Sequence, residues 1–189
     1  VLRAFKTGEI NKDQAMKRLE RSPSWVWTAM DPTSKLLVVV DVGSRTLAMA
    51  QRDVHQVTQV LAPGCVPLFL TDGLKDYGTA LLTHFGYWMQ PERRQAKGPR
   101  PKSRWMPLPA LLYAQVVKSY RRWRLVGVTH RVVFGTRLAI EQILAPCGWT
   151  INPAFVERLN LDLRQRVAAI GRRVNTRCQG EAGLRNQLV

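Results

Sequence analysis

The sequence predicts an α/β fold with a mixed sheet, because strands and helices alternate along the chain. Two strand-like runs, at residues 25–30 and 35–42, flank a turn of typical turn residues and predict a hairpin. A helix is predicted at 46–61, where apolar residues recur at helical spacing. A short apolar strand at 66–70 and a further helix at 74–85 complete this pattern.

Beyond this point the pattern is more varied. The predicted elements are a strand at 86–90, a basic, proline-rich loop at 91–109, a helix at 110–121, short strands at 125–128 and 131–134, a helix that Thr136 caps, and a helix at 152–170. Asn152 followed by Pro153 is a typical helix start, and Gly171 a typical end. Upstream of the hairpin, residues 2–5 have strand character and Asn11 begins a short helix.

Composition limits the classes of protein that the chain can belong to. Of its 189 residues 46% are hydrophobic, which is enough for a core. No apolar run approaches the roughly 18 residues that a membrane helix needs. The chain has three cysteines, Cys65, Cys147 and Cys178, which is an odd number, and none of them forms a C-x-x-C pair. This argues against a zinc site or a disulfide framework and favours a reducing cytoplasm.

Positive charge is concentrated in the second half of the chain. Residues 1–91 contain 10 Lys/Arg and 8 Asp/Glu, whereas residues 92–189 contain 19 and 5. Such an imbalance predicts a polyanionic partner, and nucleic acid is the first candidate. We expect three segments: 1–91 as the first part of a core, 92–150 as a basic, partly helical insertion, and 151–189 as a late helix and the remainder of the core.

Two acidic residues stand out as candidates for chemistry. Asp72 follows a short apolar strand, and ligands of open α/β sheets gather at the carboxyl ends of strands. Asp-Gly is also a common turn pair, so this position alone is ambiguous. Glu157 shares one helix face with Asn160 and Arg164, opposite the apolar face, although a solvated polar face would look the same.

The full strings at these positions are more specific. The run Phe69-Leu-Thr-Asp-Gly73, with Tyr77 beyond it, and the run from Phe155 to Arg164 together resemble the DDE transposases of the insertion-sequence-one type. The resemblance implies a ribonuclease H-like fold with a mixed five-stranded sheet. The hairpin at 25–42 matches the family's second and third strands.

The resemblance also implies a mechanism. Asp, Asp and Glu hold two divalent ions, Mg²⁺ or Mn²⁺, which support DNA cleavage and strand transfer. Asp72 corresponds to the second acid and Glu157 to the third. DNA at the element ends and the target would be the partner, bound by an oligomer on the bacterial nucleoid. The expected DNA-binding residues are Arg93, Arg94, Lys97, Lys102, Arg104, Arg158, Asn160, Arg164, Arg172 and Arg173.

The first acid of the motif has no counterpart here. Asp31 lies in the hairpin turn and Asp41 ends an expected edge strand, so neither suits the first ligand. We expect that acid to precede Val1 and this chain to be inactive in strand transfer. Two other functions stay open: a non-catalytic nucleic-acid-binding protein with the same fold, and another ribonuclease H-like nuclease.

Overall fold

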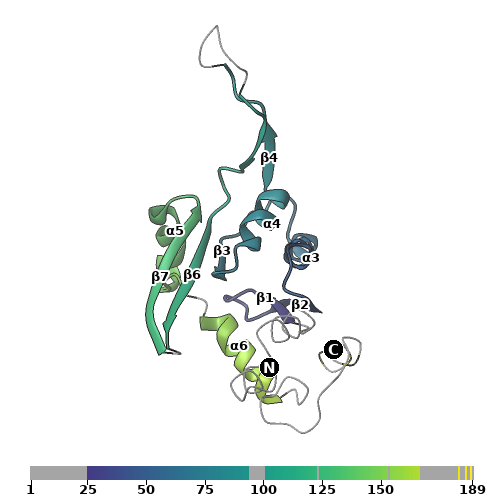
Figure 1. Cartoon of the computed structure of the whole chain (residues 1–189), viewed down its shortest axis with the longest axis vertical. Coiled ribbons are helices and arrows are strands. Elements are labelled where there is room, and N and C mark those ends of the chain that lie inside the picture. Colours follow the sequence, from purple (N-terminus) through teal and green to yellow (C-terminus); the bar gives the residue numbers. More distant parts are fainter. Residues whose placement is uncertain are drawn as a thin grey trace, which may run out of the picture.

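The computed structural model describes residues 25–93, 101–122, 124–152 and 154–166, with residues 183, 186 and 188. It is a mixed α/β structure, as predicted, with both parallel and antiparallel strand pairs (Figure 1). Within these ranges no helix has the length and apolar character to cross a membrane. The strand and helix predicted upstream of Trp25 lie outside the described residues.

The predicted hairpin is confirmed. Strands β1 (Trp25–Met30) and β2 (Leu37–Gly43) pair antiparallel, with Trp27 opposite Asp41. The Asp31 carboxylate accepts hydrogen bonds from the backbone N–H groups of Thr33 and Ser34, each at 3.0 Å. These bonds fix the turn. The hydrogen bond from the Ser34 hydroxyl, together with the two backbone bonds, lowers the pKa of Asp31.

Two helices pack against each other beside the hairpin. Helix α3 (Leu47–Val60) begins where the Thr46 hydroxyl accepts from the Met49 N–H, and Ala62-Pro63-Gly64 lies just beyond its end. Helix α4 is Asp76–His84. Small and branched residues on both helices, Ala50, Val54, Ala80 and Leu81, are buried where the two meet.

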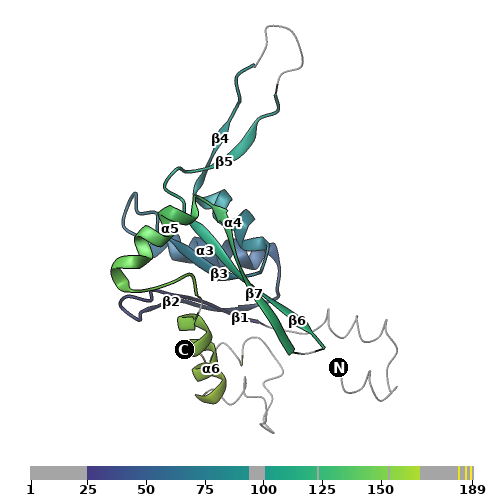
Figure 2. The same cartoon turned by 90° about the vertical axis from the view of Figure 1, so that its left-hand side faces the viewer.

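The largest sheet has the strand order β3, β6, β7. Strand β3 (Phe69–Asp72) runs parallel to β6 (Tyr113–Arg121), which pairs antiparallel with β7 (Arg124–Phe134). One face packs on α3 and α4 through Phe69 and Tyr113, and the other on α5 (Arg137–Leu144) through Ala114 and Val116. The first part of β6, Tyr113–Val116, is therefore covered on both faces of the sheet (Figure 2).

The prediction of a helix at 110–121 is wrong, because most of that segment is strand β6. Its first four residues, Tyr113 to Val116, are all buried, since β6 is the middle strand with helices on both faces. A strand buried on both faces shows no alternation of apolar and polar residues, which removes its sequence signal. The two short strands predicted at 125–128 and 131–134 form one continuous strand, β7.

A two-stranded arm projects from the body of the molecule (Figures 1 and 2). It pairs β4 (Gly86–Met89) with β5 (Arg104–Pro107), so the region 91–109 is not a loop throughout. Trp88 and Trp105 lie opposite each other with ring centroids 5.8 Å apart, and both are exposed. Pairing with the predicted strand 86–90 gives this proline-rich segment its short strand.

The two late helices start as predicted. Thr136 caps α5 by accepting from the Ala139 N–H at 3.2 Å, and a short 3-10 turn, η1 (Ala145–Cys147), follows. Helix α6 (Ala154–Arg166) begins after Asn152, whose side chain accepts from the Ala154 N–H at 3.0 Å. The described strands pair in sheets of two, three and two, so the α/β class is confirmed and the five-stranded arrangement stays a prediction.

Candidate metal centre and its surroundings

Asp72 is the last residue of β3 and lies opposite Val116 of β6. Its side chain is exposed, and Oδ1 accepts a hydrogen bond from the Leu74 N–H at 3.0 Å. This Asx-type turn fixes the carboxylate at the carboxyl end of the strand. Among the described residues only Oδ1 of this carboxylate accepts a side-chain-turn hydrogen bond, which leaves the exposed Oδ2 available to a ligand.

Glu157 lies in the first turn of α6. The helix is held beside the hairpin by Phe155, whose ring meets Trp149 at 5.4 Å between centroids and lies 3.7 Å from the Lys35 Nζ. The Glu157 carboxylate is exposed and forms an ion pair through Oε1 with Lys118 of β6. That hydrogen bond raises the pKa of Lys118 and joins α6 to the central sheet.

Both acids lie beside the middle of strand β6. Asp72 is paired with Val116, and Glu157 contacts Lys118, which lies two residues further along the strand. Residues i and i+2 of a strand point to the same face and are separated by about 7 Å. By this register, the side chains of Asp72 and Lys118 point to one face of the sheet, and the ion pair with Lys118 brings Glu157 to that face.

A buried hydrogen-bond network supports the turn that carries Asp72. The Tyr113 hydroxyl lies 2.8 Å from the Thr71 Oγ1 and accepts from the Gln115 Nε2 at 2.7 Å. The same Gln115 amide donates to the Leu74 carbonyl at 2.9 Å. The sequence analysis did not identify Tyr113 and Gln115, because it predicted a helix for this segment. Side chains alternate along a strand, so a strand prediction would have placed both residues on one face.

A second buried polar cluster lies between β2, α3 and α4. The Tyr77 hydroxyl donates to Asp53 Oδ2 at 3.0 Å, and Arg52 forms an ion pair of 2.8 Å with Asp41. Burial raises the pKa of Asp53 to about 6; the Asp41 charge adds to this rise and the Tyr77 hydrogen bond opposes it. Tyr77, singled out in the Thr-Asp-Gly motif, therefore faces Asp53, and its ring also meets Trp27 edge-on at 5.7 Å.

The described part of the chain brings no three His, Cys, Asp or Glu side chains together as a metal-binding group. His55 and His84, which match no ligand spacing in the sequence, have ring centroids 5.6 Å apart across the α3–α4 contact. One ring nitrogen of His84 is hydrogen-bonded to the Ala80 carbonyl at 2.9 Å. The two rings therefore contribute to the packing of α3 against α4.

The predicted DNA-binding residues are dispersed. Arg93, Lys102 and Arg104 are exposed on the β4–β5 arm, Arg158 is exposed on α6, and Asn160 is half-buried. Arg164 lies on α6, but its side chain is not described. The remaining residues lie outside the described ranges: Arg94, Lys97, Arg172 and Arg173. Residues 93–140 contain 12 Lys/Arg and no Asp or Glu, and four of the 12, Lys118, Arg121, Arg124 and Arg131, lie on β6 and β7.

No protein-family model, curated protein or solved structure matches the chain. The features that bear on function are therefore two carboxylates beside β6, Asp72 and Glu157, and the acid-free segment 93–140.

Proposed function

We propose that this chain forms part of the catalytic core of a DNA transposase, in which Asp72 and Glu157 bind Mg²⁺ or Mn²⁺ for DNA cleavage and strand transfer. The observation that carries the proposal is that Asp72 pairs with Val116 of β6 while Glu157 contacts Lys118, two residues further on and on the same strand face. The acids that bind catalytic ions at the end of an α/β sheet come from separate elements in this way.

The donor set fits a hard divalent cation. Asp72 Oδ2 and the second oxygen of Glu157 are carboxylate oxygens, which Mg²⁺ prefers, and the ion would keep water and phosphate as its other ligands. A bound ion would polarise a phosphate and stabilise the leaving oxygen. The chain contributes a rigid strand end and a helix to position these oxygens, and Lys118 must leave Glu157 Oε1, or share it, when an ion binds.

A ribonuclease H-like sheet is part of the proposal. The β1–β2 hairpin and β3 contribute to one core, since Trp27 and Phe69 both pack around α3 and α4. In the proposed sheet the hairpin supplies outer strands on the β3 side. The acid-free segment 93–140 supports DNA as partner, and assembly as an oligomer on DNA at the nucleoid is proposed with it.

One observation favours a second candidate function, that of a non-catalytic nucleic-acid-binding protein. Lys118 already neutralises Glu157, and a surface ion pair is a common structural role for an acid on a helix. A ribonuclease H-like nuclease with a different substrate is the remaining alternative, and it shares the proposed metal chemistry.

Metal titration tests the proposal directly. We expect Mn²⁺, measured by electron paramagnetic resonance, to bind the chain weakly, and Asp72→Asn and Glu157→Gln each to weaken this binding at least about tenfold. Asp162→Asn is the matched control, because Asp162 is an exposed, ion-paired acid on the same helix. Equal Mn²⁺ binding by all four proteins would favour the non-catalytic function, and preference for an RNA–DNA hybrid over duplex DNA would favour the nuclease.

A further inference from the structure

Strands β6 and β7 extend beyond the body of the molecule as a two-stranded ribbon. Every described residue from Ser119 to Arg131 is exposed, in contrast to the buried first half of β6. Neither view of the molecule shows a described element covering the end of this ribbon (Figures 1 and 2). Two strands alone are only marginally stable in water, so a ribbon of this length is suited to being covered by a partner.

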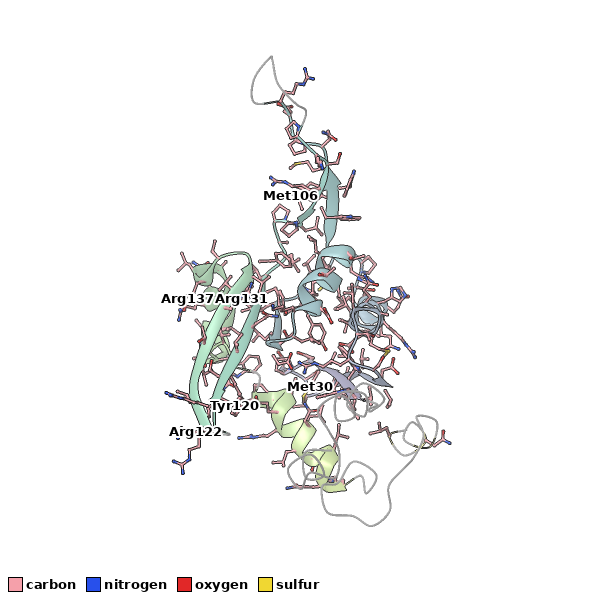
Figure 3. All side chains as sticks on the ribbon, viewed as in Figure 1. Met30, Met106, Tyr120, Arg122, Arg131 and Arg137 are labelled. Atoms are coloured by element: carbon pink, nitrogen blue, oxygen red, sulfur yellow. The ribbon has the colours of Figure 1, made fainter. Side chains whose placement is uncertain are left out.

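The ribbon has two chemically distinct faces. Opposite residues of an antiparallel pair point to the same side, so the register places Arg121 and Arg124 on one face with Ser119 and Thr129. Tyr120 and Leu125 pair on the other face, which also carries Val128, and all three are exposed. Arg122, in the turn, has a positive φ of 48° (Figure 3).

The charge of the ribbon indicates the partner. Ser119 to Arg131 carries four arginines, Arg121, Arg122, Arg124 and Arg131, and no acid. A second copy of the chain would bring arginines against arginines, which is unfavourable. A polyanion is the complementary partner, and the arginine side chain is well suited to phosphate and to guanine edges.

Among polyanions, the shape of the ribbon favours duplex DNA as the partner. The major groove admits a two-stranded antiparallel ribbon, which the minor groove is too narrow to accept without deformation. We propose that the β6–β7 ribbon enters the major groove of duplex DNA, with its arginine tip contacting phosphates and base edges. This inference rests on the proposed function in taking DNA as the partner, and it adds the element and the groove.

Strand β6 also links the tip of the ribbon to the candidate metal centre. β6 runs from Val116, opposite Asp72, through Lys118, the partner of Glu157, to Arg121 at the tip. Arg121 is the third residue beyond Lys118, which corresponds to about 10 Å along the strand. By alternation along the strand, Arg121 points to the face opposite Lys118, so the tip and the candidate metal centre lie on opposite faces of the ribbon.

The test compares two variants that each lose three positive charges. Arg121→Gln/Arg122→Gln/Arg124→Gln alters the ribbon, and Arg45→Gln/Arg137→Gln/Arg166→Gln alters exposed arginines elsewhere. Binding to a labelled duplex is measured by fluorescence anisotropy in EDTA, with circular dichroism as a check on folding. We expect the ribbon variant to bind at least about tenfold more weakly and its log–log salt slope to fall in magnitude by roughly 2–3, while the control changes little.

The groove is tested on the wild-type chain. Methylation of guanine N7, which lies in the major groove, is expected to reduce binding, whereas a minor-groove ligand such as distamycin is expected to leave it unchanged. Equal losses in the two variants, or competition by distamycin alone, would overturn the proposal. The proposal would also be overturned if the ribbon variant lost self-association, or binding to anionic vesicles, but kept its affinity for DNA. Because these measurements exclude metal, their failure is independent of the Mn²⁺ result for Asp72 and Glu157.

Discussion

Lys118 on β6 forms an ion pair with Glu157 on α6, and this contact attaches the last described helix to the end of the central sheet. The Lys118 and Glu157 side chains are 32% and 49% exposed, so water screens the pair. Its effect on folding is therefore expected to be small, and its main consequence is to occupy one oxygen of a candidate metal ligand.

Replacing Lys118 tests whether its ion pair competes with a metal ion for Glu157. In Lys118→Met the Glu157 carboxylate is released, and we expect Mn²⁺ to bind about two- to fivefold more tightly, since an exposed pair contributes up to about 1 kcal/mol. Arg166→Met is the matched control, because it releases Asp162 on the same helix. Titration by electron paramagnetic resonance gives the comparison. An unchanged Mn²⁺ affinity in Lys118→Met would mean that Glu157 is not a ligand.

Asp53 should make the stability of the protein depend on pH. Its pKa is raised to about 6 in the folded state, so its contribution is fully present below about pH 4 and is lost as the pH rises through 6. From pH 5 to pH 7.5 the free energy of unfolding should fall by about 1 kcal/mol from this group. Asp53→Asn should remove that part of the fall, measured by urea unfolding at both pH values. A variant with the same pH dependence as the wild type would show that Asp53 titrates normally.

The Tyr113 hydroxyl should matter for the turn after β3. Tyr113→Phe removes an oxygen that bonds Thr71 and Gln115 and leaves the buried Gln115 amide with one fewer acceptor. We expect the free energy of unfolding to fall by about 1–3 kcal/mol. Tyr120→Phe, at an exposed position of the same strand, should change it by less than about 0.5 kcal/mol. Chemical denaturation of both variants provides the measurement, and equal effects would argue against the network.

Two glycines with left-handed backbone differ in the space around them. Gly135 has a φ of 80°, and a Cβ there would lie 2.2 Å from Leu112 Cδ2; Gly148 has a φ of 65° and open space. Both alanine variants pay for the left-handed conformation, about 1 kcal/mol, but Gly135→Ala must also displace Leu112. Thermal unfolding should therefore show a clearly larger loss for Gly135→Ala. Similar losses would mean that Leu112 moves aside without cost.

Local signals in the sequence determined many of the elements. Thr46, Thr136 and Asn152 each accept a hydrogen bond at the start of a helix, and such capping depends only on neighbouring residues. Asp31 likewise determines the hairpin turn through bonds to residues within three positions. The position of Asp72 at the carboxyl end of a strand was also predicted from neighbouring residues. The predicted strand ended at residue 70, whereas β3 extends to Asp72 itself.

Only the tertiary structure decided the middle of the central sheet and the geometry of the candidate site. Tyr113 to Val116 form a strand because β3 and β7 supply its hydrogen bonds and helices bury both of its faces, and a local pattern contains none of these partners. The same holds for the Lys118–Glu157 pair, since the two residues belong to separate elements that long-range strand pairing and helix packing bring together. The sequence alone determined which residues are acidic and which helix ends are capped, and the strand pairing and helix packing around β6 determined which acids lie beside it.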